Sequence, residues 1–347
     1  MNKEKELPKV TVVTVVYNLI KNEREQYFRQ CLQSVHDQSY PNVEHIVMDG
    51  ASDDGTIDLL EEYHKKGWIQ YYSEPDKGIY DAMNKGVKKS SGKYIIFLNS
   101  DDFLHNETAI DVSIKKLEKD QSDFSCGIAR IINNEVPVAL RYPSIEFFMF
   151  FTPCCHQTVL MKRDVFIKEH GFNYEKYRIL ADYDLIVRAI LKGYRLSIVN
   201  EVLVSFRLGG FSSKIHEETE ILQKEYFSKL VEDRPSANEY IININELKKV
   251  SSMVCDTVKK SLSKLNYKKI GQDRAKVTIK KYWYPLVKIY KIFGIPLFSS
   301  ERLEISIYSK RKTYRLFSLK LFEKKTTPTE DQYRIFYIPV LTVKHLR

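Results

Sequence analysis

The sequence predicts an α/β protein whose mostly parallel sheet is flanked by helices and followed by a basic C-terminal accessory region. Two observations lead to this fold class. Runs of β-branched and apolar residues alternate with helical patterns from residue 8 to residue 98, and this alternation is typical of parallel sheets with right-handed crossovers. The runs also stop at aspartate-bearing turns, and open α/β sheets bind their ligands at the carboxyl ends of their strands.

The expected strands and helices follow each other in a regular order. Residues 8–18 are β-branched almost throughout and end on Asn18, which indicates a buried strand. Residues 94–98 are all apolar or aromatic without helical spacing, which indicates a strand buried on both faces. The full order expected is strands at residues 8–18, 43–49, 68–74 and 94–98, with helices at residues 23–38, 56–65 and 79–89 between them.

Composition places the chain among soluble globular proteins. Its 347 residues are 43% hydrophobic and 29% charged, and this length predicts about two domains. Residues 1–8 are charged rather than apolar, so no secretory signal is expected. The longest uncharged stretch, residues 147–161, is too short to span a membrane. Five cysteines without regular spacing indicate reduced thiols and a cytoplasmic location.

Two adjacent carboxylates, Asp101 and Asp102, follow the strand at residues 94–98. Oxygen ligands of this kind suit Mg²⁺ or Mn²⁺, especially when a substrate phosphate supplies further oxygens. The alternative is a plain polar turn, because Asn, Ser and Asp are common turn residues. No G-x-G-x-x-G follows the first strand and no G-x-x-x-x-G-K-[ST] occurs, which argues against a dinucleotide site and against a P-loop enzyme.

Four motifs at these strand ends together give the chain a family resemblance. Residues 9–215 resemble the inverting family 2 glycosyltransferases of the GT-A fold, in particular those of bacterial capsule, O-antigen and exopolysaccharide assembly. The resemblance implies that Asp49 and Asp76 read the uracil or ribose of a UDP-sugar. It also implies that Asp102, with Asp101 beside it, holds Mn²⁺ or Mg²⁺ against the diphosphate. The motifs are residues 14–18, 49–56, 74–86 and 99–102.

The resemblance extends the expected nucleotide-sugar site to several further residues. His156 matches a family segment beside donor and acceptor, where it contacts a sugar or diphosphate or makes a structural hydrogen bond. Arg207 begins a segment that covers the diphosphate in the family, and its planar guanidinium suits phosphate; His216 is the alternative. The remaining expected donor-site residues are Thr14, Val16, Tyr17, Asn18, Gly78, Asn84, Gly86 and Ser100.

Residues 179–188 contain two candidates for the catalytic base. An acceptor hydroxyl is a poor nucleophile and needs a base close to its proton. In the resembled family a carboxylate of this segment does that work, usually as the second residue of a Glu-Asp pair, and here Ala181 stands in the first place. This leaves Asp182 as the expected base and Asp184 as the fallback. The alternative is a pair of acids that merely favour a helix N-terminus.

The chain beyond the transferase part is strongly basic. From residue 251 onward it carries 22 Lys and Arg against 7 Asp and Glu, which indicates a polyanionic partner for this region. Between residues 268 and 293 the bases alternate with large aromatics, as on proteins that bind anionic membranes; an accessory domain with a solvated basic face is the alternative. No nucleic-acid-binding module is recognised. Three related strand-like units are expected at residues 290–298, 314–322 and 333–341.

These observations predict three parts: a GT-A domain at residues 1–225, a helical linker at 226–284 and a basic aromatic-rich region at 285–347. The expected activity is inverting, metal-dependent transfer of a sugar from a UDP-sugar to a glycan or lipid-linked saccharide in cell-surface polysaccharide synthesis. The expected location is cytoplasmic, at the inner face of the membrane. One rival is a non-catalytic scaffold. The other is a nucleotidyltransferase, which normally has a basic glycine-rich loop that residues 16–20 lack.

Overall fold

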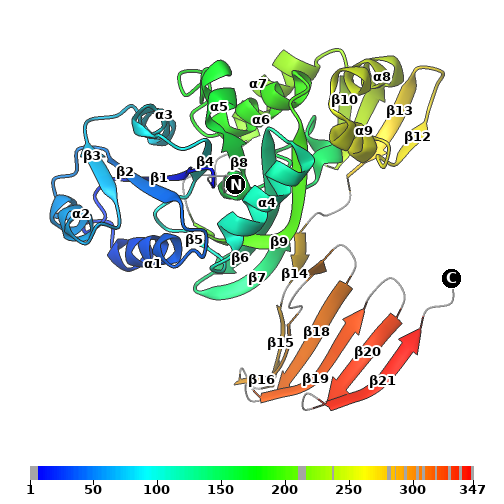
Figure 1. Cartoon of the computed structure of the whole chain (residues 1–347). Helices are drawn as coiled ribbons and strands as arrows, with labels where there is room; N and C mark the ends of the chain where they lie inside the picture. The colour runs from blue at the N-terminus through cyan, green and yellow to red at the C-terminus, as the bar shows by residue number, and fades with distance from the viewer. Residues whose placement is uncertain are drawn as a thin grey trace, which may run out of the picture.

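A central mixed sheet with helices on both faces forms the body of the protein in this computed structural model (Figure 1). The structure describes residues 7–209, 216–236 and 238–279, and beyond them the backbone of strands between residues 283 and 344. The N-terminal half of the sheet is parallel in the order β3-β2-β1-β4. These strands are β1 (Val10–Val16), β2 (Val43–Asp49), β3 (Gln70–Ser73) and β4 (Tyr94–Phe97). The predicted α/β fold class and its strand–helix order are confirmed.

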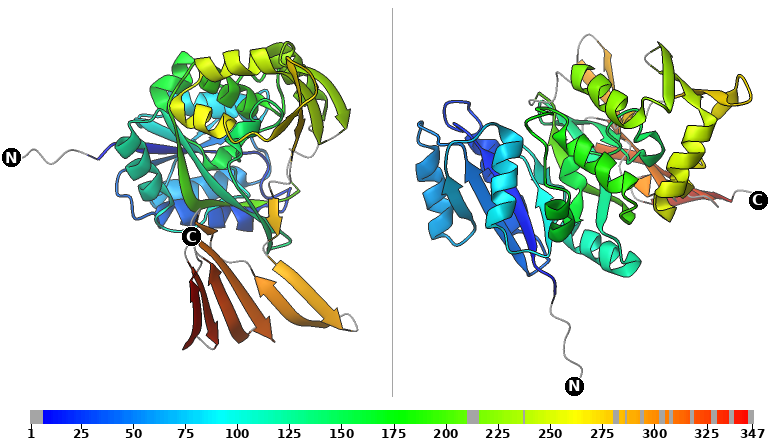
Figure 2. Two further views of the ribbon diagram at one scale, coloured as in Figure 1. Left: turned by 90° about the vertical axis from the view of Figure 1, so that its right-hand side faces the viewer. Right: turned by 90° about the horizontal axis from the view of Figure 1, so that it is seen from above.

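Successive residues of β1 pack on opposite faces of the sheet. Val13 and Val15 join the core cluster that contains Met83 of helix α3. Val16 joins the cluster formed with Phe28 of α1 and with residues of α2, so the sheet is covered on both sides (Figures 1 and 2). Both faces of the strand are therefore buried, which explains its unbroken β-branched sequence. The helices are α1 (Glu25–His36), α2 (Thr56–Lys65) and α3 (Ile79–Lys89).

The second half of the sheet brings distant parts of the chain to the end of β4. Strand β8 (Leu160–Lys162) pairs antiparallel with β4 and with β6 (Phe124–Asn133). Strand β9 (Leu196–Arg207) runs parallel to β6 and pairs with the short β5 (Phe103–Leu104). This pairing places the end of β9 beside the residues that follow β4. The remaining elements here are α4 (Ala109–Asp120), β7 (Val136–Arg141), α5 (Arg163–Lys168), α6 (Ala181–Leu191) and β14 (Trp283–Pro285).

Residues 226–284, expected as a helical linker, also contain a four-stranded antiparallel sheet in the order β10-β11-β13-β12. In β11 and β13, buried Tyr240, Ile242, Ala275 and Val277 alternate with more exposed residues. This period of two is typical of a half-buried strand. The alternation was not recognised in the sequence, because each strand is short and lies in a polar segment. The elements are α7 (His216–Phe227), β10 (Val231–Ser236), β11 (Glu239–Asn243), α8 (Ile244–Met253), α9 (Asp256–Leu262), β12 (Tyr267–Lys269) and β13 (Arg274–Thr278). The domain boundaries stay predictions.

The C-terminal strands form a separate seven-stranded sheet, in which each of the three related sequence units is one antiparallel hairpin. The first and last residues of each unit pair with each other: Tyr290 with Phe298, Tyr314 with Phe322, and Tyr333 with Leu341. A register shift follows the tyrosine in all three hairpins, so the sequence repeat corresponds to a backbone repeat. The strands are β15 (Val287–Ile292), β16 (Ile295–Glu301), β17 (Ile305–Ser306), β18 (Ser309–Leu316), β19 (Leu319–Thr326), β20 (Glu330–Ile335) and β21 (Ile338–Lys344).

In the part of the chain that the structure describes, none of the helices combines the length and the apolar character needed to cross a bilayer. The turns of the C-terminal hairpins lie outside the described residues. The expected membrane surface of this region therefore stays a prediction.

Candidate active site

A cavity of about 650 Å³ opens at the carboxyl ends of β1 and β4. Its walls come from the end of β1, the turn at residues 76–78, the turn after β4, the segment that precedes β8, the start of α6 and the end of β9. The structure thus gathers residues that are far apart in the sequence. The expected site residues that line it are Val16, Tyr17, Asp76, Gly78, Ser100, Asp101, His156, Asp182 and Arg207.

Other expected donor-site residues lie behind this cavity wall and hold its loops in place. The buried carboxylate of Asp49 accepts hydrogen bonds from the Ser52 backbone N–H (2.9 Å) and the Ser73 hydroxyl (2.7 Å). The side chain of Asn18 accepts one from the Asp53 N–H (3.0 Å). Thr14 is buried and its hydroxyl is 2.9 Å from Nε2 of His45. Direct nucleotide contacts of these residues stay predictions.

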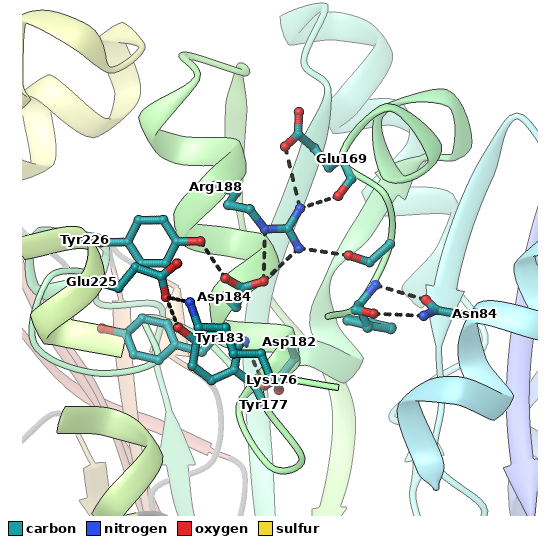
Figure 3. A network of polar contacts seen from close by, with 12 residues as sticks. Asn84, Glu169, Lys176, Tyr177, Asp182, Tyr183, Asp184, Arg188, Glu225 and Tyr226 are labelled. Carbon is teal, nitrogen blue, oxygen red and sulfur yellow. Dashed lines mark hydrogen bonds and ion pairs between the residues drawn. The ribbon is translucent and has the colours of Figure 1, made fainter. Parts of the chain in front are cut away.

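Asn84 and Gly86 fasten helix α3 to its neighbours. The Asn84 side chain makes two hydrogen bonds with the backbone of Phe172, each 2.9 Å long (Figure 3). A Cβ atom on Gly86 would lie 2.5 Å from a methyl group of Val13, so the close contact between α3 and β1 requires glycine. Neither residue is among those that line the cavity, and their expected place in the donor pocket is untested.

The adjacent carboxylates Asp101 and Asp102 occupy different environments. Asp102 is buried, and its two oxygens accept hydrogen bonds from Nε2 of Gln157 (2.7 Å) and from the backbone N–H of Arg207 (2.8 Å). Burial, together with the nearby charge of Asp101, raises the pKa of Asp102 well above its usual range. Asp101 instead lines the cavity, where its carboxylate is 3.2 Å from the guanidinium of Arg24. Asp101 is therefore the one of the pair that a ligand in the cavity can reach.

A divalent cation at this place would need ligands beyond the protein. Among the described residues, no group of three or more His, Cys, Asp and Glu side chains could hold a metal by itself. Magnesium-type sites commonly combine one or two carboxylates with substrate phosphate oxygens. The cavity-facing carboxylate of Asp101 fits such a shared site, and the guanidinium of Arg24 is its partner in this structure.

The side chain of Arg207 makes several hydrogen bonds and one aromatic contact within the protein. Its guanidinium donates to Glu135 (2.7 and 2.9 Å), to Gln30 and to the backbone carbonyl of Asp101. It also lies over the ring of Tyr27, 4.3 Å from the ring centre. The guanidinium of Arg207 is thus already bound to protein groups, and its expected contact with a donor phosphate stays a prediction. The alternative, His216, is the first residue of α7; its side chain lies outside the described part, as do residues 210–215.

Asp182 lies in the cavity wall at the start of α6 and pairs with His156. Its Oδ2 is 2.9 Å from Nδ1 of His156, and its Oδ1 accepts the backbone N–H of Tyr183 (2.7 Å). Burial alone would raise the pKa of Asp182, but the hydrogen bond and charge of His156, the Tyr183 N–H and the Tyr80 hydroxyl lower it overall. The carboxylate is therefore stabilised in its ionised form.

Asp184, the fallback base, is turned into a separate polar network (Figure 3). One of its oxygens accepts two hydrogen bonds from Arg188 (2.9 and 2.8 Å) and the other accepts the hydroxyl of Tyr226 (2.7 Å). Arg188 in turn donates to the backbone carbonyl of Gly171 (2.8 Å). Asp184 is fully buried and is not part of the cavity wall. Of the two candidates, only Asp182 lines the cavity.

Sequence reasoning missed several residues of this site, and three of them make contacts that shape it. Tyr80 lines the cavity and donates a 2.7 Å hydrogen bond to the carbonyl of Ile179, which ties α3 to the start of α6. Gln157 fixes Asp102; it directly follows His156, so its place in the same motif could have marked it. Arg24 stands in no recognised motif, and only the folded chain brings it to Asp101.

Comparisons with known proteins agree on one family. The sequence model described as glycosyl transferase family 2 matches residues 11–201. A PGL/p-HBAD biosynthesis glycosyltransferase of Mycobacterium bovis is 29% identical over 207 residues, which cover 58% of this chain and 77% of the relative. A putative teichuronic acid biosynthesis glycosyltransferase, TuaG of Bacillus subtilis, is 38% identical over 97 residues, which cover 27% of this chain and 36% of TuaG.

Solved structures resemble the chain more distantly. Residues 1–349 of S. aureus TarS, in complex with UDP-GlcNAc, give a TM-score of 0.48 at 20% identity. This match covers 58% of this chain and 59% of the TarS chain. The mannosyltransferase PcManGT of Pyrobaculum calidifontis, in complex with GDP-Man and Mn²⁺, gives a TM-score of 0.46 at 18% identity, with 57% and 56% of the two chains covered.

Proposed function

The chain belongs to glycosyl transferase family 2, and from this membership we propose an inverting, metal-dependent enzyme that uses a nucleotide-sugar, with a UDP-sugar as the expected donor. The acceptor is a hydroxyl group of a glycan or of a lipid-linked saccharide. One observation carries the proposal: Asp101 and Asp182 line one cavity, whereas Asp102 and Asp184 are buried and do not line it. Each expected carboxylate pair thus supplies one member to the cavity.

The donor diphosphate lies, in this proposal, at the Asp101 end of the cavity. Asp101 and the diphosphate together would hold Mn²⁺ or Mg²⁺, which would offset the negative charge that develops on the departing nucleotide. Arg24, 3.2 Å from Asp101, is the positively charged group with which the cation would compete for this carboxylate. The turn at Asp76 and Gly78 also lines this cavity and is the proposed neighbour of the nucleoside.

The acceptor enters from the side of Asp182. Its hydroxyl oxygen attacks the anomeric carbon from the face opposite the diphosphate, a new glycosidic bond forms, and the bond to the diphosphate oxygen breaks. Inversion follows from this single displacement. Asp182 supplies the negative charge that drives removal of the hydroxyl proton, since it is the carboxylate of α6 that lines the cavity.

Cell-surface polysaccharide synthesis is the proposed setting. It is supported by the names of two relatives, which act in PGL/p-HBAD and putatively in teichuronic acid biosynthesis. The basic region at residues 268–347 is the proposed contact with an anionic membrane surface, which would bring the enzyme to a lipid-linked acceptor.

Nucleotide release and ligand stabilisation test this function together. Purified protein is mixed with a panel of UDP- and GDP-sugars, with and without Mn²⁺, and both free nucleotide and melting temperature are measured. We expect a metal-dependent rise in melting temperature with one donor, because a ligand that binds only the native state stabilises it, and UDP release with that donor. Release of pyrophosphate would identify a nucleotidyltransferase. The absence of any shift or release across the panel would contradict the proposal and favour the scaffold.

A further inference from the structure

The side chains of His156 and Asp182 line the cavity together and are in contact with each other. Nδ1 of the ring is 2.9 Å from Oδ2 of Asp182, and the ring belongs to the cavity wall. Its other nitrogen, Nε2, is buried and has no hydrogen-bond partner among the described residues. Because an ionised carboxylate accepts at Nδ1, the proton of the neutral ring resides on Nδ1 and the lone pair on Nε2. The ring thus keeps one basic atom without a protein partner in the site.

Asp182 is less well suited to take a proton itself. One of its oxygens is bound to His156 and the other to the backbone N–H of Tyr183. These two hydrogen bonds stabilise its ionised form against the effect of burial. The Nε2 atom of His156 has no hydrogen-bond partner among the described residues, and a neutral imidazole can accept a proton at such a nitrogen.

We propose that Nε2 of His156 receives the proton of the acceptor hydroxyl, while Asp182 holds the ring and stabilises the imidazolium that forms. This inference rests on the proposed function. As the hydroxyl O–H bond breaks, its electron pair forms the new bond to the anomeric carbon. The pair of the old glycosyl bond leaves with the diphosphate, and the proton resides on Nε2 until it passes to solvent. The order carboxylate, imidazole, hydroxyl is the one that activates serine in hydrolases.

The surroundings of the ring support this order. The carboxylate in direct contact with the ring is that of Asp182. Glu218 of α7 is turned to the backbone N–H groups of Ile179 and Leu180, each 2.9 Å away. The other titratable or charged groups near the Asp182–His156 pair are Tyr80 from α3, Arg141 from β7, and Cys154 and Cys155 from the segment before the ring. A negative partner thus lies at Nδ1, and Nε2 remains for the acceptor.

The substitution His156→Asn tests the roles of Nδ1 and Nε2 of His156 separately. The amide nitrogen of asparagine can take the place of Nδ1 and donate to Asp182, but the variant has no atom equivalent to Nε2. We expect kcat to fall about 10²- to 10⁴-fold, the contribution usual for a general base, with the donor KM changed by no more than about threefold. The fall of wild-type kcat toward acid pH, where histidine gains a proton, should disappear in the variant.

His105→Asn is the matched control. His105 is bonded through Nδ1 to the Ser205 hydroxyl at 3.1 Å and does not line the cavity, so its kcat and pH profile should equal those of the wild type. Melting temperatures with and without the nucleotide confirm that each variant is folded. If His156→Asn does not fold, His156→Gln is measured in its place, and loss of the acid-side pH dependence is the deciding result.

Two outcomes would overturn the inference. If His156→Asn keeps kcat within threefold while Asp182→Asn loses it, Asp182 takes the proton directly and His156 only positions it. If His156→Asn raises the donor KM with kcat intact, the ring is a donor contact. Failure of the proposed function looks different, because the wild-type protein itself would then release no nucleotide from any donor.

Discussion

The guanidinium of Arg24 lies 3.2 Å from the carboxylate of Asp101, with side-chain exposures of 41% and 15%. In the proposed metal site, the cation and Arg24 compete for the same carboxylate. Solvent-exposed ion pairs of this kind contribute about 0.2–1 kcal/mol. We therefore expect Arg24→Gln to lower the Mn²⁺ concentration for half-maximal rate by about 1.4- to 5-fold.

A metal titration of the rate measures this effect. Arg29→Gln is the matched control, because Arg29 lies on α1, which begins directly after Arg24, but pairs with Glu25 and Glu62, away from the cavity. That variant should leave the titration unchanged. An unchanged or higher Mn²⁺ requirement in Arg24→Gln would show that Arg24 does not compete with a metal for Asp101.

Asp101 and Asp102 should respond in opposite ways to substitution. Asp101→Asn removes a cavity carboxylate and should abolish metal-stimulated turnover while the melting temperature stays near that of the wild type. Asp102→Ala leaves Nε2 of Gln157 and the N–H of Arg207 without their acceptor, and each buried unsatisfied group costs about 1–3 kcal/mol. Urea unfolding and initial rates separate the two effects. A stable Asp102→Ala protein that has lost metal stimulation would instead place the metal on Asp102.

Asp182 and Asp184 form a second pair of this kind. Asp184→Ala leaves Arg188 and the Tyr226 hydroxyl without their buried acceptor (Figure 3), and loss of one partner from a buried ion pair costs about 3–5 kcal/mol. The expected result is a much lower unfolding free energy, with turnover retained at temperatures where the variant is folded. Asp182→Asn should lose turnover with a smaller change in stability. Loss of turnover in fully folded Asp184→Ala would make Asp184 the base.

These pairs show where sequence reasoning reaches its limit. The position of the cavity at the ends of β1 and β4 could be predicted, because the apolar runs before Asn18 and Asn99 mark buried strands by themselves. The different roles of Asp101 and Asp102 could not, because the partners of Asp102 are Gln157 and Arg207. Those partners reach it through the pairing of distant strands, and no local pattern encodes that pairing.

The region after residue 226 illustrates the same limit. Its helices α8 and α9 follow from local periodicity, whereas the strands around Tyr240 and Val277 are defined by their pairing with each other. A short strand of alternating residues inside a polar segment resembles a helix turn until its partner is known. The C-terminal repeat was easier to recognise, since three copies of the same residues reinforce one another.

Stability below neutral pH should depend on His45, a buried residue of β2 whose Nε2 is 2.9 Å from the Thr14 hydroxyl. Burial lowers the pKa of His45 from 6.5 to about 3. Between these values the unfolded chain binds a proton that the folded chain does not, so stability is lost as the pH falls through this window. The loss is at most about 1.4 kcal/mol per pH unit, or about 2 kcal/mol between pH 7 and pH 5.

His45→Gln can keep a hydrogen bond to Thr14 without titrating. Urea unfolding of both proteins at the two pH values should therefore show the wild type losing about 2 kcal/mol more than the variant; parallel losses would mean that His45 takes up a proton in the folded protein.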